Sequence, residues 1–162
     1  MGWFARHTQL LSPSREEALP ECWFDAQAWA DVEPVSTGGR GAAWFVAQAD
    51  NGFVLRHFRR GSLDSRVLTD QYFATGADKS RALREYVLLD RLHCLGLPVP
   101  EPVAARYVRR GVFYRADILT VRLENTESLA ERLIAGSMPR HQWEALGALI
   151  SRFHQAGAYH AD

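Results

Sequence analysis

The alternation of apolar and polar positions predicts strands in the first part of the chain and helices in the last part. Short apolar runs bounded by turn residues predict strands within 38–46 and at 52–58, 103–108 and 112–121. Asp50-Asn51-Gly52 stands between the first two strands, and Asn-Gly tolerates the positive φ of a tight turn. These two strands are therefore expected to form a hairpin.

The spacing of apolar residues predicts a helix over residues 81–95. Leu88, Leu92 and Leu95 recur at helical spacing, and Gly96 and Pro98 end the pattern. We expect these leucines to mark the buried face of the helix.

Two further helices are predicted after residue 127. Ser128 and Glu131 have the spacing of a capping box, which predicts a short helix ending near Gly136. A longer amphipathic helix follows Pro139, and its apolar stripe consists of Trp143, Leu146, Leu149, Ile150 and Phe153. Such a stripe is typical of a core face whose partners lie outside this chain. We therefore expect the isolated chain to self-associate, because large exposed apolar patches promote association.

A glycine-rich segment precedes the first strand of the expected hairpin. It consists of Gly38, Gly39, Arg40 and Gly41. Glycine lets backbone N–H groups approach phosphate oxygens closely, because no Cβ stands in the way. The segment is a candidate phosphate-binding turn, and the alternative is a surface hairpin without a ligand.

Arg56 and Glu85 are candidates for an ion pair between strand and helix. Glu85 lies one turn before Leu88, and a carboxylate on a buried face needs a partner because an unpaired buried charge is costly. Arg56 ends the second strand of the hairpin, and its guanidinium can bind phosphate or carboxylate bidentately. We expect the two side chains to form an ion pair. The alternatives are a surface arginine on an edge strand and a solvated glutamate.

The chain ends in His160-Ala161-Asp162, after a helix and a glycine stop. This ending resembles the catalytic loop of protein-kinase-like phosphotransferases, in which the Asp accepts the hydroxyl proton of the substrate. In that superfamily a nearby Asn holds a metal ion, and the position of Arg56 usually carries a lysine that pairs with the nucleotide phosphates. The resemblance therefore implies that Arg56 holds phosphates and that Glu85 orients Arg56. We therefore expect a chain truncated at the catalytic loop, inactive by itself, with Asp162 as the catalytic base.

Longer strings are similar to the bacterial lipopolysaccharide kinase family over roughly residues 30 to 162. The most specific are Leu-Arg-His-Phe-Arg-Arg-Gly at 55–61 and Gly-Leu-Pro-Val-Pro at 96–100; the others are 39–44, 84–86 and 159–162. The resemblance implies ATP-dependent phosphorylation of a 3-deoxy-D-manno-octulosonic acid (Kdo) sugar on the lipid A precursor. It also implies a location at the cytoplasmic face of the inner membrane.

The fold implied is α+β, a protein-kinase-like N-terminal lobe made of an antiparallel sheet and one helix. Residues 1–30 would be an N-terminal extension, 31–121 the N-lobe, and 122–162 the hinge and part of the C-lobe. The hinge includes Glu124, where backbone groups would read the adenine ring. The family also implies Mg²⁺, with its ligands expected beyond the end of this chain.

Composition limits the remaining classes of function. The formal net charge of +0 gives no field that would favour nucleic acid. Cys22 and Cys94 lack metal-ligand spacing and are expected to be reduced thiols, and no run is long enough to span a bilayer, so any membrane contact is expected to be peripheral. A basic cluster could attract an anionic sugar or a membrane, or could be a solvated loop; it consists of His57, Arg59, Arg60 and Arg66.

Two other functions remain open. One is a different small-molecule kinase of the same superfold, such as an aminoglycoside-type phosphotransferase. The other is a non-catalytic, pseudokinase-like binding module, which Arg56 in the lysine position would favour.

Overall fold

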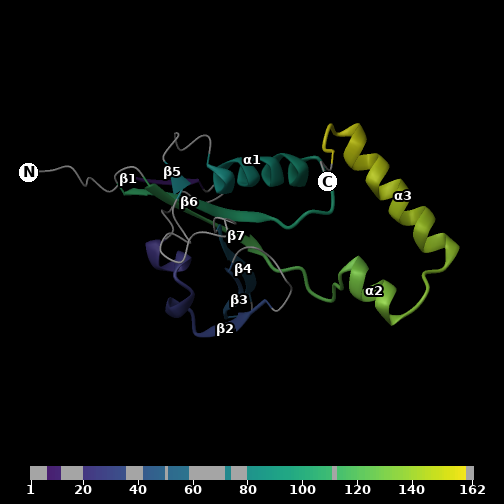
Figure 1. Ribbon diagram of the computed structural model, residues 1–162, viewed down its shortest axis with the longest axis horizontal. Helices are drawn as coiled ribbons and strands as arrows, with labels where there is room; N and C mark the ends of the chain where they lie inside the picture. The colour runs from purple at the N-terminus through teal and green to yellow at the C-terminus, as the bar shows by residue number, and fades with distance from the viewer. Residues whose placement is uncertain are drawn as a thin grey trace, which may run out of the picture.

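The computed structural model describes residues 7–11, 20–35, 42–49, 51–58, 72–73, 80–110 and 113–159. An antiparallel sheet forms the centre of the molecule (Figure 1). Its strands are β1 (His7–Leu11), β2 (Asp31–Pro34), β3 (Ala42–Gln48), β4 (Asn51–His57), β5 (Tyr72–Phe73), β6 (Pro102–Arg110) and β7 (Phe113–Val121). Their order is β1-β6-β7-β4-β3-β2, with β5 paired to β7. The α+β architecture expected from the sequence is confirmed.

Each face of the sheet carries its own apolar core. Helix α1 (Arg81–Cys94) packs on β6 and β7 and covers one face. Two 3-10 helices, η1 (Glu21–Phe24) and η2 (Ala26–Ala28), precede β2 and bring Phe24 and Trp29 onto the other face. The alternation along β4 serves both cores, as the pleat requires: Phe53 and Leu55 pack with Phe24, whereas Phe58, directly after β4, packs with α1.

The N-terminal segment thus contributes one strand to this sheet and two 3-10 helices that pack on it. Trp29 donates its indole N–H to the carbonyl of Trp23 (3.0 Å), and the rings of Trp23, Trp29 and Phe53 pack together. The division of the chain into an extension, an N-lobe and a partial C-lobe remains a prediction.

The buried face of α1 differs from the predicted one. Ser80 caps the helix by accepting from the N–H of Leu83, and the buried side chains are Ala82, Leu83, Tyr86 and Leu92. Leu88 and Leu95 are 49% and 56% exposed, so the prediction was wrong for both. The leucines of this helix fall on two overlapping stripes with helical spacing, and only contact with the sheet decides which stripe is buried.

The predicted hairpin is confirmed, but its turn is not at Asn51-Gly52. Both residues belong to β4, where Asn51 pairs with Gln48 and Gly52 with Ala47. Ala49, with φ of 51°, takes the left-handed conformation that the prediction gave to Asn-Gly. At position 52 the strand passes close to the segment after β7: a Cβ there would lie 3.2 Å from Oε1 of Glu124.

Helices α2 (Leu129–Ala135) and α3 (Arg140–Gln155) follow the sheet and extend to one side of it (Figure 1). The predicted capping box is present: the backbone N–H of Glu131 donates to the Ser128 hydroxyl (3.1 Å), and the backbone N–H of Ser128 donates to the Glu131 carboxylate (2.8 Å). The end of α3 returns toward the end of α1, where Arg152 donates to the carbonyl of Gly96 (3.1 Å).

The apolar stripe of α3 remains open on the described part of the chain. Trp143 and Ile150 are each 46% exposed, and no side chain of α3 is buried among the described residues. The predicted amphipathic helix therefore exists, and its apolar face is partly covered: Leu146, Leu149 and Phe153 are partly buried, whereas Trp143 and Ile150 are exposed.

Candidate active site

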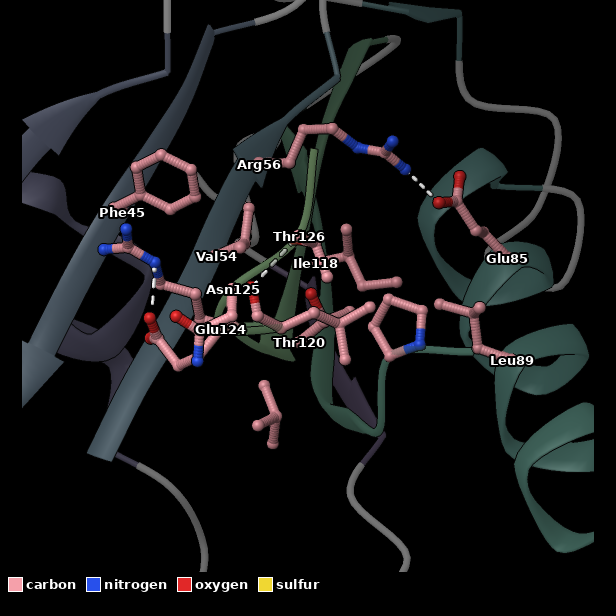
Figure 2. Close-up of a pocket in the computed structure, with 14 residues that line it drawn as sticks. Phe45, Val54, Arg56, Glu85, Leu89, Ile118, Thr120, Glu124, Asn125 and Thr126 are labelled. Carbon is pink, nitrogen blue, oxygen red and sulfur yellow. Dashed lines mark hydrogen bonds and ion pairs between the residues drawn. The ribbon is translucent and has the colours of Figure 1, made fainter. Parts of the chain in front are cut away.

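A cavity of about 510 Å³ lies between the sheet, α1 and the segment after β7 (Figure 2). It is lined by Phe45, Val54, Arg56, Glu85, Leu89, Pro100, Ile118, Thr120, Val121, Arg122, Leu123, Glu124, Asn125 and Thr126. The pleat places the β4 and β7 members on the same side of the sheet, since Val54 is opposite Thr120 and Arg56 is opposite Ile118 in the strand register.

The cavity has an apolar part and a charged part. Val54 and Ile118 from the sheet and Leu89 from α1 form an apolar wall suited to a flat, weakly polar group. Arg56 and Glu85 provide the charged groups beside this wall (Figure 2). A ligand with an apolar ring and an anionic tail matches this division.

Arg56 and Glu85 form the ion pair that the sequence predicts. A guanidinium nitrogen of Arg56 donates to Oε1 of Glu85, and the side chains are 39% and 29% exposed. The two side chains point toward one another from β4 and α1 (Figure 2). The guanidinium carbon of Arg56 also lies 4.7 Å from the centroid of the Phe58 ring. The pair joins the strand to the helix and holds a cation at the cavity.

The Nε atom of Arg56 is buried and has no hydrogen-bond partner among the described residues. A buried donor without a partner costs free energy of about 1–3 kcal/mol. One guanidinium nitrogen of the same side chain contacts Glu85, while Nε has no partner among the described residues. The hydrogen-bond donors of the guanidinium are therefore only partly used.

The segment after β7 is held in a defined shape by backbone and side-chain contacts. The N–H of Val121 donates to the carbonyl of Glu101 (2.9 Å), and the hydroxyl of Thr126 donates to the carbonyl of Leu123 (3.1 Å). Asn125 adopts a positive φ of 54°, a conformation that Asn tolerates better than most residues. We call residues 122–126 the hinge segment.

Glu124 belongs to the hinge segment and lines the cavity, and its predicted place at an adenine site remains a prediction. Its side chain is 64% exposed, and Oε1 is 3.4 Å from Nε of Arg122. An exposed carboxylate of this kind can orient a neighbouring arginine but adds little stability by itself.

Several predicted site residues lie outside the described residues. They are Gly38, Gly39, Arg40, Gly41 and Asp162, together with Arg59, Arg60 and Arg66 of the predicted basic cluster. Of that cluster only His57 is described. It does not face the cavity: its Nδ1 lies 2.5 Å from Oδ1 of Asp117, and it contributes to a separate hollow on the opposite face of the sheet.

A buried charge cluster that the sequence pattern did not predict lies on that opposite face. Asp117 is 3% exposed and accepts from Nε of Arg106 at 2.7 Å as well as contacting His57. Arg106 also reaches the carbonyl oxygens of Glu21 and Phe24 at 3.4 Å, which ties η1 to the sheet. The available signal was an aspartate within the otherwise apolar strand of residues 116–119, since a carboxylate there must find partners.

Burial alters the titration of two tyrosines near α1. Burial, and to a lesser extent the charge of Asp90, raises the pKa of Tyr86 to about 12. Burial also raises the pKa of Tyr107 on β6. The hydroxyl of Tyr86 has no hydrogen-bond partner in the described parts of the chain, so both findings indicate an apolar environment beneath α1.

The described residues contain neither a cluster of metal ligands nor a helix that could span a membrane. Within the ranges that the structure describes, no group of three or more His, Cys, Asp or Glu side chains could hold a metal ion. None of the described helices combines the length and the apolar character that crossing a bilayer requires. Cys22 and Cys94 are both exposed free thiols.

Comparison with known proteins gives a consistent result. The family model described as "Lipopolysaccharide kinase (Kdo/WaaP) family" matches residues 26–162. A protein of Stenotrophomonas maltophilia (strain K279a) named 3-deoxy-D-manno-octulosonic acid kinase is 46% identical over 141 residues, which are 86% of this chain and 56% of that protein. Proteins of the same name from Xylella fastidiosa (strain M12) and Xanthomonas campestris pv. campestris (strain B100) are 47% and 48% identical, over 83% and 86% of this chain and 54% and 56% of their own lengths. The chain therefore spans about half the length of the curated relatives it matches. No solved structure matches it significantly.

Proposed function

This chain belongs to the lipopolysaccharide kinase (Kdo/WaaP) family, and we propose that it carries the ATP-binding part of a kinase that phosphorylates a Kdo sugar. The acceptor would be a Kdo-containing lipid A precursor. The reaction would transfer the γ-phosphoryl group of ATP to a sugar hydroxyl, with ADP as the leaving group. The name that these relatives share, 3-deoxy-D-manno-octulosonic acid kinase, supports the proposal of a Kdo acceptor.

One observation carries the proposal: the Arg56–Glu85 ion pair lies in the same cavity as the hinge segment. Phosphoryl transfer depends on holding the nucleotide and neutralising its charge, so a fixed cation beside an apolar ring site is the required arrangement. Arg56 would bind phosphate oxygens, and Glu85 would keep its guanidinium oriented. An arginine here differs from the lysine usual in kinases, because its planar fork can contact two oxygens at once.

ATP fits the residues that line the cavity. The adenine ring would lie along Val54, Ile118 and Leu89, beside backbone groups of the hinge segment that includes Glu124. Binding of a flat ring in an apolar cleft with a few polar groups at its edge is the usual form of a small-molecule site.

The remaining roles fall on residues outside the described ranges. Gly38, Gly39, Arg40 and Gly41 would cover the phosphates through backbone N–H groups. Asp162 would accept the proton of the sugar hydroxyl as that oxygen attacks phosphorus. Mg²⁺ is proposed as the partner of the triphosphate, and the described residues assign no ligand to it.

The cellular setting follows from the substrate class. A Kdo acceptor attached to lipid A would be met at the cytoplasmic face of the bacterial inner membrane, so we place the protein there as a peripheral protein. The exposed stripe on α3, with Trp143 and Ile150, supports the further proposal that the isolated chain self-associates.

A binding module without catalytic activity is the second candidate, and the arginine at position 56 favours it. The two functions differ in what ATP does after binding. A module without activity would bind ATP and leave it intact, whereas a kinase converts it to ADP as the acceptor gains phosphate.

The test uses the complete gene product, MgATP and a Kdo-bearing lipid A precursor, with phosphate followed on the acceptor. An aminoglycoside serves as the matched alternative acceptor. We expect phosphate on the Kdo acceptor alone, and loss of the reaction in Asp162→Asn. Transfer to the aminoglycoside only would assign the other kinase class, and ATP binding without transfer to either acceptor would assign the binding module.

A further inference from the structure

Arg122 joins the hinge segment to both strands of the β3–β4 hairpin. Its backbone N–H donates to the carbonyl of Gly52 in β4 (3.0 Å). Its guanidinium carbon lies 3.9 Å from the centroid of the Phe45 ring in β3. A single residue therefore makes one polar and one stacking contact across the gap between the hairpin and the hinge segment.

These contacts lie in the wall of the cavity. Phe45, Arg122 and Glu124 all line it, and Figure 2 shows Phe45 and Glu124 on the side away from Glu85 and Leu89. Arg122 is thus separate from the Arg56–Glu85 pair, although both contribute to the same cavity.

The hairpin and the hinge segment approach each other closely at this point. A Cβ on Gly52 would lie 3.4 Å from Cβ of Arg122 and 3.2 Å from Oε1 of Glu124. The same Oε1 is 3.4 Å from Nε of Arg122, which favours the stacked orientation of the guanidinium. The Arg122 side chain is 35% exposed, so its interaction with the aromatic ring is partly shielded from water.

We propose that Arg122 is a positioning residue for the nucleotide base, holding Phe45 in the cavity wall and fixing the spacing between the hairpin and the hinge segment. The inference rests on the proposed ATP site. A flat base between two surfaces gains dispersion energy only when both surfaces touch it, and a small gap forfeits much of that energy. A hairpin held at a fixed spacing therefore binds the base without first having to be ordered.

This role predicts a particular dependence on the ligand. Arg122 acts on the base, so its removal lowers the affinity for adenosine and for ATP by the same factor. Arg56 acts on phosphates, so its removal lowers the affinity for ATP and leaves the affinity for adenosine unchanged. A structural defect that merely unfolds the chain would not separate the two ligands in this way.

The experiment is a calorimetric titration of this chain with adenosine and with ATP. Arg122→Ala is expected to weaken both ligands by about 3- to 10-fold, the range that loss of one cation–π contact gives. Phe45→Leu is expected to have a similar effect, and the double variant to lose no more than the weaker-binding single variant, because the two residues act together. Arg140→Ala, which removes a 93% exposed arginine on α3, is the matched control and is expected to bind both ligands normally.

The possible outcomes separate the inference from the proposed function. If the unaltered chain binds neither ligand, the proposed function fails and the inference with it. If the chain binds both and Arg122→Ala retains adenosine affinity within about twofold, the inference alone is overturned. A loss confined to ATP also overturns it, because Arg122 would then act as a charge on the phosphates. Should Arg122→Ala fail to fold, unchanged adenosine affinity in Phe45→Leu overturns the inference.

Discussion

Asp117 of β7 lies directly opposite His57 of β4, and Oδ1 of the aspartate is 2.5 Å from Nδ1 of the histidine. Arg106 of β6 is the cross-strand neighbour of Asp117 on its other side and contacts Oδ2. A row of charged groups therefore crosses three adjacent strands on the face of the sheet away from α1. His57 directly follows Arg56 in β4, so this row helps to fix the strand that carries the phosphate-binding candidate.

Asp117→Ala is expected to destabilise the chain by about 3 kcal/mol, because it leaves Arg106, whose side chain is only 15% exposed, without its carboxylate partner. The free energy of unfolding from urea titration measures the effect. Asp31→Ala, an exposed aspartate on β2, is the control and should change stability little. Equal stability of the two variants would contradict a stabilising role for the charge row.

Tyr86→Phe is expected to stabilise the chain at neutral pH by about 1 kcal/mol. The hydroxyl of Tyr86 is buried without a partner among the described residues, and removing it abolishes a desolvation cost. Chemical denaturation at pH 7 gives the comparison, with Tyr159→Phe, at a 73% exposed position, as the control. A clear loss of stability in Tyr86→Phe would show that the hydroxyl has a partner in the folded protein.

Alkaline pH is expected to destabilise the chain through the same residue. The pKa of Tyr86 is raised from 10.0 to about 12 in the folded state, so this tyrosine ionises first in the unfolded state. Its ionisation leaves stability unchanged below pH 10 and lowers stability as the pH rises from 10 through 12. A shift of this size corresponds to about 2–3 kcal/mol. Denaturation curves between pH 9 and pH 12, compared with those of Tyr86→Phe, isolate this contribution from other tyrosines. Parallel pH profiles for the two proteins would refute it.

The open stripe on α3 is expected to drive self-association of the chain. Trp143→Glu places a charge within the stripe and should shift the protein toward monomer in sedimentation velocity, because the apolar patch is interrupted. Ala148→Glu, at an exposed position on the same helix and away from the stripe, should leave association unchanged. A monomeric unaltered chain at high concentration would rule out the proposal.

The sequence predicted those features that depend on local periodicity. The α+β class, the hairpin, the capping box of α2 and the amphipathic helix α3 follow from such patterns, and all are present. The Arg56–Glu85 contact was also predicted and is present, although Leu88, from which the inward face of Glu85 was inferred, is exposed.

Features set by tertiary contact could not be predicted in the same way. Leu88 has the same spacing as the buried leucines, yet α1 turns it to solvent. Gly52 resembled a turn glycine, whereas it lies within β4 and close to Glu124, a residue far along the chain. The charge row around Asp117 depends on the order of β4, β7 and β6, which the sequence pattern does not specify.

The central claim is that Arg56 and Glu85 act as one unit in binding ATP. Arg56→Ala and Glu85→Ala are each expected to weaken ATP binding by about tenfold, since either change removes the oriented cation. Arg56→Lys should be the mildest change at this position, because it retains a charge that can reach phosphate.

The decisive measurement is the ATP dissociation constant of the double variant, Arg56→Ala with Glu85→Ala, compared with those of both single variants. The account predicts that the double variant binds ATP no less tightly than the single variant with the lower ATP affinity. The second substitution removes a partner that no longer has a function. A double variant whose loss equals the product of the two single losses would contradict the account, since the residues would then act independently.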